Sequence, residues 1–307
     1  MHLLLHTSSA TIGGWHAALS AALPEAQVSR WPDAPPAIDY AAVWKPPPEL
    51  LGAARGVKAI FNLGAGVDAL MREPMLPAAV PVIRIEDGGM AEQMVDYVTL
   101  AVLAAYREQR IYAAQQRDAA WQQRPYRDKA AFGVGLLGLG VLGQSVAAAL
   151  ARLGFPLAGW SRERKAVAGV DTYAGIAELP QFLARSQVLV CLLPATPATR
   201  GLLGAARLSQ LPRGAHLVNV ARGDIVVDAD LLAALDAGHL ASATLDVFHE
   251  EPLPRTHAFW HHPRITLTPH VSAITLIDVS AAQIAGKIRR LEQGLPVTGV
   301  VDRERGY

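Results

Sequence analysis

The sequence predicts an α/β protein with two doubly wound, Rossmann-like parallel-sheet domains and a cleft between them. Short apolar runs alternate with helical segments over the first 90 residues, and the alternation resumes at Phe132. Such alternation is typical of parallel strands joined by helical crossovers. Gly138, Gly140 and Gly143 stand in the spacing G-x-G-x-x-G, between an apolar run and a helical segment that ends at Gly154. That context favours a dinucleotide-binding turn over a glycine-rich turn without a ligand.

The composition is that of a globular protein with room for two domains. The chain has 307 residues, of which 51% are hydrophobic and 18% charged, so apolar material suffices for sizeable cores. The net charge of +1 gives no electrostatic case for nucleic acid or an anionic membrane as partner. The single cysteine, Cys191, excludes an intrachain disulfide and a cysteine-based metal site. Its apolar neighbours predict a buried strand residue.

Two segments have some features of a membrane or targeting signal, but neither fits one. The first residues, Met1–His6, lack a basic region, and their apolar core is too short for a signal peptide. Phe132–Leu150 is near the length that crosses a bilayer, but five glycines in its first twelve residues favour a strand, a turn and a helix. We therefore expect a soluble, cytoplasmic protein.

Four strands and two helices are predicted before residue 90. The strands are His2–His6, Ala41–Trp44, Val57–Leu63 and Val82–Ile85, and the helices are Trp15–Leu23 and Glu49–Ala54. From Met90 to about Ala120, apolar residues recur at helical spacing, which predicts one long helix. Trp121–Lys129 is polar with one proline and is expected to be a linker.

Six strands with helical crossovers are predicted after Phe132. Beyond the strand before the glycine turn they are Pro156–Trp160, Gln187–Leu193, His216–Val220, Ala243–Val247 and Ile265–Thr268, with helices at Gln144–Gly154, Ile176–Ala184 and Ala229–Ala237. A further helical segment, Leu276–Gly294, can return the chain to the first unit. We expect a discontinuous substrate-binding domain, residues 1–97 plus 276–307, and a dinucleotide (NADP)-binding domain, residues 98–275.

The glycine turn has the chemistry of a phosphate cradle. The first glycine makes the tight turn, the second lets the backbone approach a pyrophosphate, and the third lets helix and strand pack closely. Unpaired N–H groups at the helix start attract the phosphates. The expected contacts with the cofactor are therefore Gly138, Gly140, Val141, Leu142 and Gly143.

The end of the second strand indicates which dinucleotide binds. A carboxylate there would bind the ribose 2′-hydroxyl of NAD, and an arginine would accommodate the 2′-phosphate of NADP. This chain has Ser161 and Arg162 there, with Arg164 and Lys165 as further cations. Ser161 can donate a hydrogen bond to the phosphate and Arg162 a charge-assisted one. We expect NADP(H), with Glu163 facing solvent; the alternative is a solvated basic turn.

Three polar side chains follow predicted strands at the edge of the sheet where ligands bind. They are Arg222, Glu251 and His270. Reduction of a 2-oxo acid needs its carboxylate held, its carbonyl polarised and a proton delivered to the new alkoxide. Arg222 suits the first two tasks and His270 the third, with Glu251 orienting the histidine. Each of the three residues alone also has an ordinary structural explanation. Arg222 can be a surface arginine, Glu251 a solvated glutamate and His270 a histidine at a strand end.

The other histidines of this half are expected to be loop residues. They are His249, His257, His261 and His262. Adjacent histidines point apart, so no metal site is expected at the last two.

Five strings resemble the D-isomer-specific 2-hydroxyacid dehydrogenases, and the similarity spans nearly the whole chain. They are Gly138–Gly143, Leu192–Gly201, Asn219–Gly223, Leu245–Pro252 and Thr268–His270. Within that family, Trp160–Arg162 and Asn62–Asp68 resemble the glyoxylate/hydroxypyruvate reductase A branch.

The resemblance implies roles for particular residues. The catalytic set would be Arg222, Glu251 and His270, with Arg222 and His270 also binding substrate. The substrate carboxylate would bind backbone N–H groups in the turn made of Leu63, Gly64, Ala65 and Gly66. The cofactor would be lined by Leu193, Pro194, Val220, Ala221, Asp246, which lies near the nicotinamide amide, and Met94, which replaces a small aliphatic residue. Trp44 and Lys45 would face the cleft from the first domain.

The expected activity is NADPH-dependent reduction of small 2-oxo acids, with glyoxylate and hydroxypyruvate leading and His270 as general acid. The resemblance also implies a homodimer built on the second domain, to which Thr99–Tyr112 can contribute. Two alternatives stay open: an NAD-dependent dehydrogenase of a larger 2-hydroxy acid, and a catalytically silent, nucleotide-sensing binding protein. No metal, nucleic acid or membrane is expected as partner.

Overall fold

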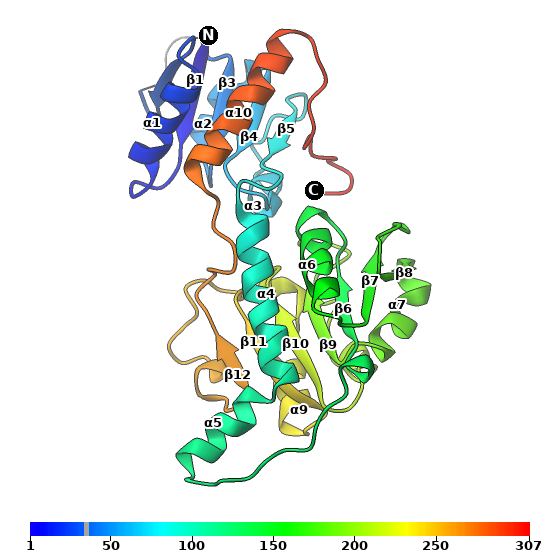
Figure 1. The fold of residues 1–307 in the computed structure, drawn as a ribbon. Helices are drawn as coiled ribbons and strands as arrows, with labels where there is room; N and C mark the ends of the chain where they lie inside the picture. Colours follow the sequence, from blue (N-terminus) through cyan, green and yellow to red (C-terminus); the bar gives the residue numbers. More distant parts are fainter. Residues whose placement is uncertain (34–36) are drawn as a thin grey trace. The chain divides into compact units, whose positions relative to one another are not determined.

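The chain forms two compact units, each built on one parallel sheet (Figure 1). A computed structural model describes residues 1–33 and 37–307. Unit 1 comprises Met1–Met90 and Ile274–Tyr307, and unit 2 comprises Ala91–Ala273. These boundaries lie close to the expected ones, and the functions expected of the two domains stay predictions. The α/β class is confirmed, because helices flank both parallel sheets.

Unit 1 has a five-stranded parallel sheet in the order β2-β1-β3-β4-β5. Its strands are β1 (His2–His6), β2 (Gln27–Arg30), β3 (Tyr40–Val43), β4 (Ala59–Asn62) and β5 (Val82–Arg84). Every residue of β3 and β4 is buried, as expected for central strands covered on both faces. The order reverses between β1 and β3, where ligands of such sheets bind.

The helices of unit 1 come from both ends of the chain. They are α1 (Ile12–Ala22), α2 (Pro48–Ala53), α3 (Asp68–Met71) and α10 (Ile277–Glu292), with a 3-10 turn η1 (Ala54–Gly56). Figure 1 shows α10 beside α1, and its Ile284 and Ile288 are fully buried. The tail then pairs with β5: Val301 N–H donates to Val82 O at 2.8 Å. The C-terminal segment therefore completes this unit.

Unit 2 has a seven-stranded parallel sheet in the order β12-β11-β10-β9-β6-β7-β8. Its strands are β6 (Val134–Leu137), β7 (Leu157–Ser161), β8 (Asp171–Ala174), β9 (Val188–Cys191), β10 (Ala215–Asn219), β11 (Leu240–Leu245) and β12 (Ile265–Leu267). Cys191 is fully buried in β9, as predicted, and burial raises the pKa of its thiol to about 12. The order reverses between β6 and β9, so the glycine turn after β6 stands at this reversal.

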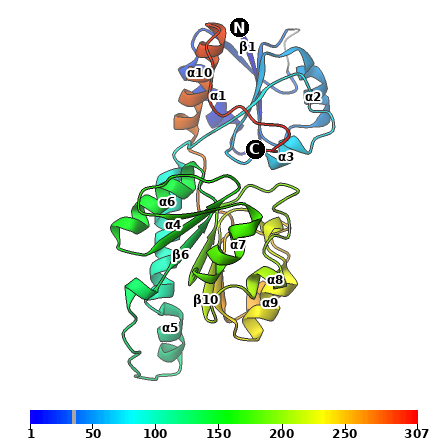
Figure 2. The same cartoon turned by 90° about the vertical axis from the view of Figure 1, so that its right-hand side faces the viewer.

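Helices cover both faces of the second sheet. They are α4 (Met90–Tyr106), α5 (Gln109–Arg117), α6 (Val141–Arg152), α7 (Gly175–Ala184), α8 (Ala205–Leu208) and α9 (Asp228–Asp236), with 3-10 turns η2 (Lys129–Ala131), η3 (Gly223–Ile225) and η4 (Ala258–His261). Figure 2 shows α4 and α6 on one face and α7, α8 and α9 on the other. Each face has its own apolar core. No helix in the described part of the chain combines the length and apolar character needed to cross a membrane.

Two expectations about the elements were wrong. Strands β2 and β8 were not predicted; both lie at sheet edges, and their short, partly exposed sequences lack an apolar run. The single long helix predicted from Met90 is two helices, because Glu108 adopts a left-handed conformation with φ 54°. The Glu108 carboxylate accepts from Arg127 at 3.1 Å and from Arg124 at 3.4 Å. These partners, distant in the sequence, stabilise the break between α4 and α5. No glycine or proline at the break signals it in the sequence.

Candidate active site

The predicted polar and glycine residues of unit 2 follow the carboxyl ends of its parallel strands. The glycine turn follows β6, Ser161 ends β7, and Leu193 and Pro194 follow β9. Arg222 follows β10, Asp246 follows β11, and His270 follows β12. Because all seven strands are parallel, these segments share one edge of the sheet.

Each glycine of the turn has its own steric reason. Gly138 has φ 120°, and a Cβ there would lie 2.9 Å from the carbonyl carbon of Leu192. A Cβ at Gly143 would lie 2.1 Å from Gly138 O, so the helix and the turn touch directly. A Cβ at Gly140 would meet nothing within 4 Å. That open space, at the first turn of α6, fits a phosphate approaching the unpaired N–H groups of Val141, Leu142 and Gly143.

The side chains after β7 only partly follow the prediction. Lys165 extends to the glycine turn, where its Nζ donates to Leu139 O at 2.9 Å. Arg162 and Glu163 are exposed. The Ser161 hydroxyl is buried and donates to Glu163 O at 2.6 Å, so its proton already has an acceptor within the chain. Arg164 is paired with Glu178. That Arg162 and Lys165 bind a phosphate stays a prediction.

His270 and Glu251 form a hydrogen-bonded pair. The His270 Nδ1 lies 2.7 Å from Glu251 Oε2, and the other carboxylate oxygen accepts from Phe248 N–H at 3.0 Å. A carboxylate only accepts, so the Nδ1 carries the proton of this bond. The His270 backbone is left-handed, with φ 55°, and its N–H donates to Asp246 O at 2.9 Å.

Asp246 is fully buried and holds the segment that carries His270. Its Oδ1 accepts from the Thr268 hydroxyl at 2.6 Å and from Val271 N–H at 2.9 Å, and its Oδ2 accepts from Ser272 N–H at 2.8 Å. The Tyr97 hydroxyl lies 2.5 Å from that of Thr268, and burial raises the pKa of Tyr97. Residues 268–272 are therefore fixed on one buried carboxylate.

The segment that carries Arg222 is held by its own strand end. The Asn219 side chain donates to Arg222 O at 3.0 Å and accepts from Ala221 N–H at 3.2 Å. One guanidinium nitrogen of Arg222 donates to Ala221 O at 2.7 Å. Val220 and Ala221 are both buried beside this segment.

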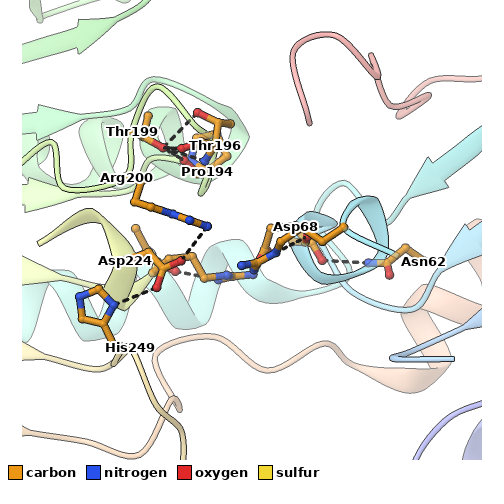
Figure 3. A network of polar contacts seen from close by, with 12 residues as sticks. Asn62, Asp68, Pro194, Thr196, Thr199, Arg200, Asp224 and His249 are labelled. Atoms are coloured by element: carbon orange, nitrogen blue, oxygen red, sulfur yellow. Dashed lines mark hydrogen bonds and ion pairs between the residues drawn. The ribbon is translucent and has the colours of Figure 1, made fainter. Parts of the chain in front are cut away.

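Three other predicted cofactor contacts, Leu193, Pro194 and Met94, are buried or partly buried. Leu193 is nearly buried, and its backbone N would lie 3.2 Å from a Cβ at Gly138, so the segment after β9 adjoins the glycine turn. The carbonyl of Pro194 accepts from the Thr199 hydroxyl at 2.7 Å (Figure 3). Met94 is buried in α4, in the core cluster that includes Val98.

Unit 1 presents the predicted carboxylate-binding turn after β4. Leu63 is buried, and a Cβ at Gly64 would lie 2.6 Å from Cζ3 of Trp44, so the indole packs on this glycine. The N–H groups of Gly64, Ala65 and Gly66 have no acceptor among residues 1–33 and 37–307. They can therefore bind an anion.

Asn62 is the site residue that sequence reasoning missed. It ends β4 with 2% exposure, and its side-chain amide donates to Gly64 O at 2.8 Å and to Gly66 O at 3.0 Å. Holding both carbonyls on one side leaves the N–H groups for a ligand. The available signal was a buried amide directly after an apolar strand.

Lys45, beside Trp44, is exposed with φ 46°.

Of the histidines expected in loops, His257 and His262 contact carboxylates, whereas His261 ends the turn η4. Nε2 of His262 lies 3.2 Å from Asp236, and that of His257 lies 3.4 Å from Asp228. In the part of the chain that the structure describes, no three His, Cys, Asp or Glu side chains gather as a metal site would require.

Residues 99–272 match the family model described as D-isomer specific 2-hydroxyacid dehydrogenase, NAD binding domain. The chain belongs to this family. It is 46% identical over 300 residues to a glyoxylate/hydroxypyruvate reductase A from Yersinia enterocolitica, a match that covers 95% of this chain and 96% of that protein. A protein of the same name from Salmonella newport is 46% identical and matched over 100% of both chains.

Solved structures of 2-hydroxyacid dehydrogenases have the same fold. One from Xanthobacter autotrophicus Py2, in complex with NADPH and MES, is 43% identical with a TM-score of 0.94, and the match covers 100% of this chain and 99% of that one. An NADPH-dependent glyoxylate/hydroxypyruvate reductase from Sinorhizobium meliloti, in complex with NADP and sulfate, is 38% identical with a TM-score of 0.92 over 100% and 99% of the chains.

The His270 ring is held at Nδ1 by Glu251, and its Nε2 takes no part in that bond. Arg222 brings a planar fork of donors that suits a carboxylate.

Proposed function

We propose that this 2-hydroxyacid dehydrogenase reduces small 2-oxo acids, with glyoxylate and hydroxypyruvate as leading substrates and NADPH as reductant. The His270–Glu251 hydrogen bond carries the proposal, because it prepares a proton donor at the sheet edge that also bears the glycine turn. The names of the relatives and the NADPH and NADP in the related structures support the substrates and the cofactor.

The chain has the features that NADPH needs. The open space at Gly140 and the first turn of α6 suit the pyrophosphate, and Lys165 with Arg162 suits the 2′-phosphate. Ser161 contributes to the 2′-phosphate only if its bond to Glu163 O is exchanged. When bound, the nicotinamide supplies a hydride to C2 of the substrate.

The residues of this chain then supply the proton and the charge stabilisation. The Nε2–H of His270 transfers its proton to the carbonyl oxygen as that oxygen becomes a hydroxyl, and Glu251 holds the ring through Nδ1. Arg222 polarises the carbonyl and, with the N–H groups of Gly64–Gly66, binds the carboxylate. We assign cofactor binding and catalysis to unit 2, and carboxylate binding to the turn in unit 1.

We also propose a homodimer through the nucleotide-binding unit. Exposed apolar side chains on and after α4 support it: Leu100 is 70% exposed and Trp121 fully exposed. The cytoplasmic location stays a prediction.

A spectrophotometric panel tests the proposed activity. NADPH and NADH are each combined with glyoxylate, hydroxypyruvate, pyruvate and phenylpyruvate, and we expect the highest kcat/KM for glyoxylate and hydroxypyruvate with NADPH. Faster reaction with NADH and phenylpyruvate would favour the dehydrogenase of a larger acid. NADPH binding without turnover of any 2-oxo acid would favour the nucleotide-sensing protein.

The change Arg222→Ala tests the assigned arginine. Losing its donors should lower kcat with glyoxylate by about 100-fold or more, as loss of an oxyanion-stabilising donor does. Arg213→Ala is the matched control, because Arg213 is an exposed arginine before β10, at the opposite edge of the same sheet. NADPH oxidation by Arg222→Ala at the wild-type rate would contradict the assignment.

A further inference from the structure

The segments that carry Arg222 and Glu251 touch through their backbones. A Cβ at Gly223 would lie 2.0 Å from the carbonyl carbon of Phe248 and 2.3 Å from His249 N. The residue after the arginine is therefore packed on the residues that precede the glutamate. Any shift between these two segments changes the position of Arg222 relative to Glu251 and its partner His270.

The side chain of His249 bridges this contact. Its Nδ1 lies 3.0 Å from Asp224 Oδ1, and its Nε2 lies 3.2 Å from Val226 O. Figure 3 shows His249 directed at Asp224. The carboxylate and the carbonyl are both acceptors, so both bonds form together only when both ring nitrogens carry protons. The bridge is complete in the imidazolium and loses one bond in the neutral ring.

Four charged or titratable groups surround the bridge. Asp224 faces Nδ1, and Asp228 lies 3.9 Å from Nε2. Arg200 lies 3.6 Å from the second oxygen of Asp224, and His257 lies 3.4 Å from Asp228. Burial raises the pKa of Asp228, and its two histidine neighbours act against that shift.

The bridge also reaches the segment after β9. Gly201 N–H donates to Asp224 O at 2.8 Å, and the Arg200 side chain points to the Asp224 carboxylate (Figure 3). Asp224 thus joins three segments that follow β9, β10 and β11.

We propose that His249 is a positioning residue: in its doubly protonated form it fixes the Arg222 segment on the Glu251 segment through Asp224 and Val226. This inference rests on the proposed reduction of 2-oxo acids. His249 is about half exposed, so as a surface ion pair it adds little to stability. Its effect is on the position of Arg222 relative to Glu251 and His270, and the relative position of such groups controls the rate of reaction.

The test compares His249→Phe with His249→Asn, and uses His262→Phe as the matched control. His262 also pairs with an aspartate, Asp236, the last residue of α9, which belongs to neither of these segments. His249→Phe removes both donors and should lower kcat/KM for glyoxylate at least about tenfold. The Kd for NADPH and the Tm should stay near the wild-type values. His262→Phe should keep the wild-type kcat/KM.

His249→Asn separates the bridge from simple packing. Its amide can donate to Asp224 at every pH but cannot reach Val226 O, so it should recover much of the lost rate. The pH profile of its kcat/KM should also fall less steeply on the alkaline side than that of the wild type, because one titrating group is gone. Wild-type kcat/KM in His249→Phe, or a loss of rate that only follows a loss of Tm, overturns the inference. If His249→Phe does not fold, Asp224→Asn must lower kcat/KM in its place.

A measurement without substrate keeps this inference separate from the proposed activity. In nitrogen-15 spectra, the ring signals of His249 are those missing in His249→Asn. We expect two ring N–H protons protected from exchange with water at acidic pH, and one at alkaline pH. Unprotected ring protons at acidic pH would overturn the bridge even if the enzyme reduces glyoxylate. Protected protons in a protein that reduces no 2-oxo acid would leave the bridge standing and reject the activity.

Discussion

His270, the proposed proton donor, has an unfavourable backbone conformation. Non-glycine residues rarely adopt positive φ, and the cost is of order 1–3 kcal/mol. The conformation at φ 55° persists because Asp246 binds the His270 N–H through its carbonyl and the following two N–H groups through its carboxylate. The ring is then held by Glu251. Backbone and ring are thus fixed by two different acids.

The change Glu251→Gln tests the second of these acids. The amide oxygen can still accept from Phe248 N–H, but the charge beside His270 is lost. We expect kcat for glyoxylate to fall about 10- to 100-fold, within the range of general acid–base effects, while NADPH affinity is unchanged.

Glu250→Gln is the matched control for this change, because the neighbouring glutamate is exposed. Equal kcat in the two variants would remove Glu251 from the mechanism.

At the scale of elements, each unit has a strand that ends in a buried asparagine whose side chain bonds the segment that follows. The chain has two asparagines, Asn62 at the end of β4 and Asn219 at the end of β10, and both are buried. Each amide bonds backbone groups of the segment that follows: Asn62 holds Gly64 and Gly66, and Asn219 holds Ala221 and Arg222. A buried strand end thus fixes the shape of an otherwise irregular loop.

The change Asn62→Ala tests this arrangement at the turn that we propose binds the substrate carboxylate. Two carbonyls would lose their donor, so the turn would no longer present its N–H groups in one direction. We expect KM for glyoxylate to rise about tenfold, as for the loss of about 1.4 kcal/mol of binding, with kcat and NADPH affinity little changed. A KM equal to that of the wild type would show that the turn does not bind the carboxylate.

The elements and motif positions followed from the sequence more readily than the contacts between side chains. Apolar runs and glycine spacing report burial and backbone shape, which are local, so the strands that precede the glycine turn and Arg222 were predicted to within a few residues. The bond from Ser161 to Glu163 O, the left-handed Glu108 and the bridge at His249 depend on which neighbour each side chain meets after folding. Strands β2 and β8 were missed because an edge strand needs few apolar residues.

At the scale of the whole molecule, stability at acid pH should depend on His216 in β10. Burial, followed by the charges of Arg127 and Arg110, lowers its pKa from 6.5 to about 4. The folded protein therefore binds this proton more weakly than the unfolded chain. The stabilisation is fully present above about pH 6.5 and is lost as the pH falls toward 4.

His216→Asn tests this dependence while keeping an amide beside Ser242, whose hydroxyl lies 2.7 Å from His216 Nδ1. Between about pH 6.5 and 4.5, the wild type should lose about 2 to 3 kcal/mol more unfolding free energy than the variant, from the size of the pKa shift. Urea unfolding at both pH values gives this difference. The exposed His261 provides the control, since His261→Asn should follow the wild type. A variant with the same acid sensitivity as the wild type would rule out His216 as its source.

The packing of α10 on α1 and of the tail on β5 has a consequence for synthesis on the ribosome. Unit 2 is one continuous stretch of sequence. Unit 1 is interrupted by unit 2, so its helix α10 is synthesised only after unit 2. The nascent sheet of unit 1 therefore spends the translation of some 180 residues with α1 uncovered and the edge of β5 unpaired. An open strand edge invites pairing with other chains. The first part of unit 1 thus depends for its protection on residues 274–307, which are made only after unit 2.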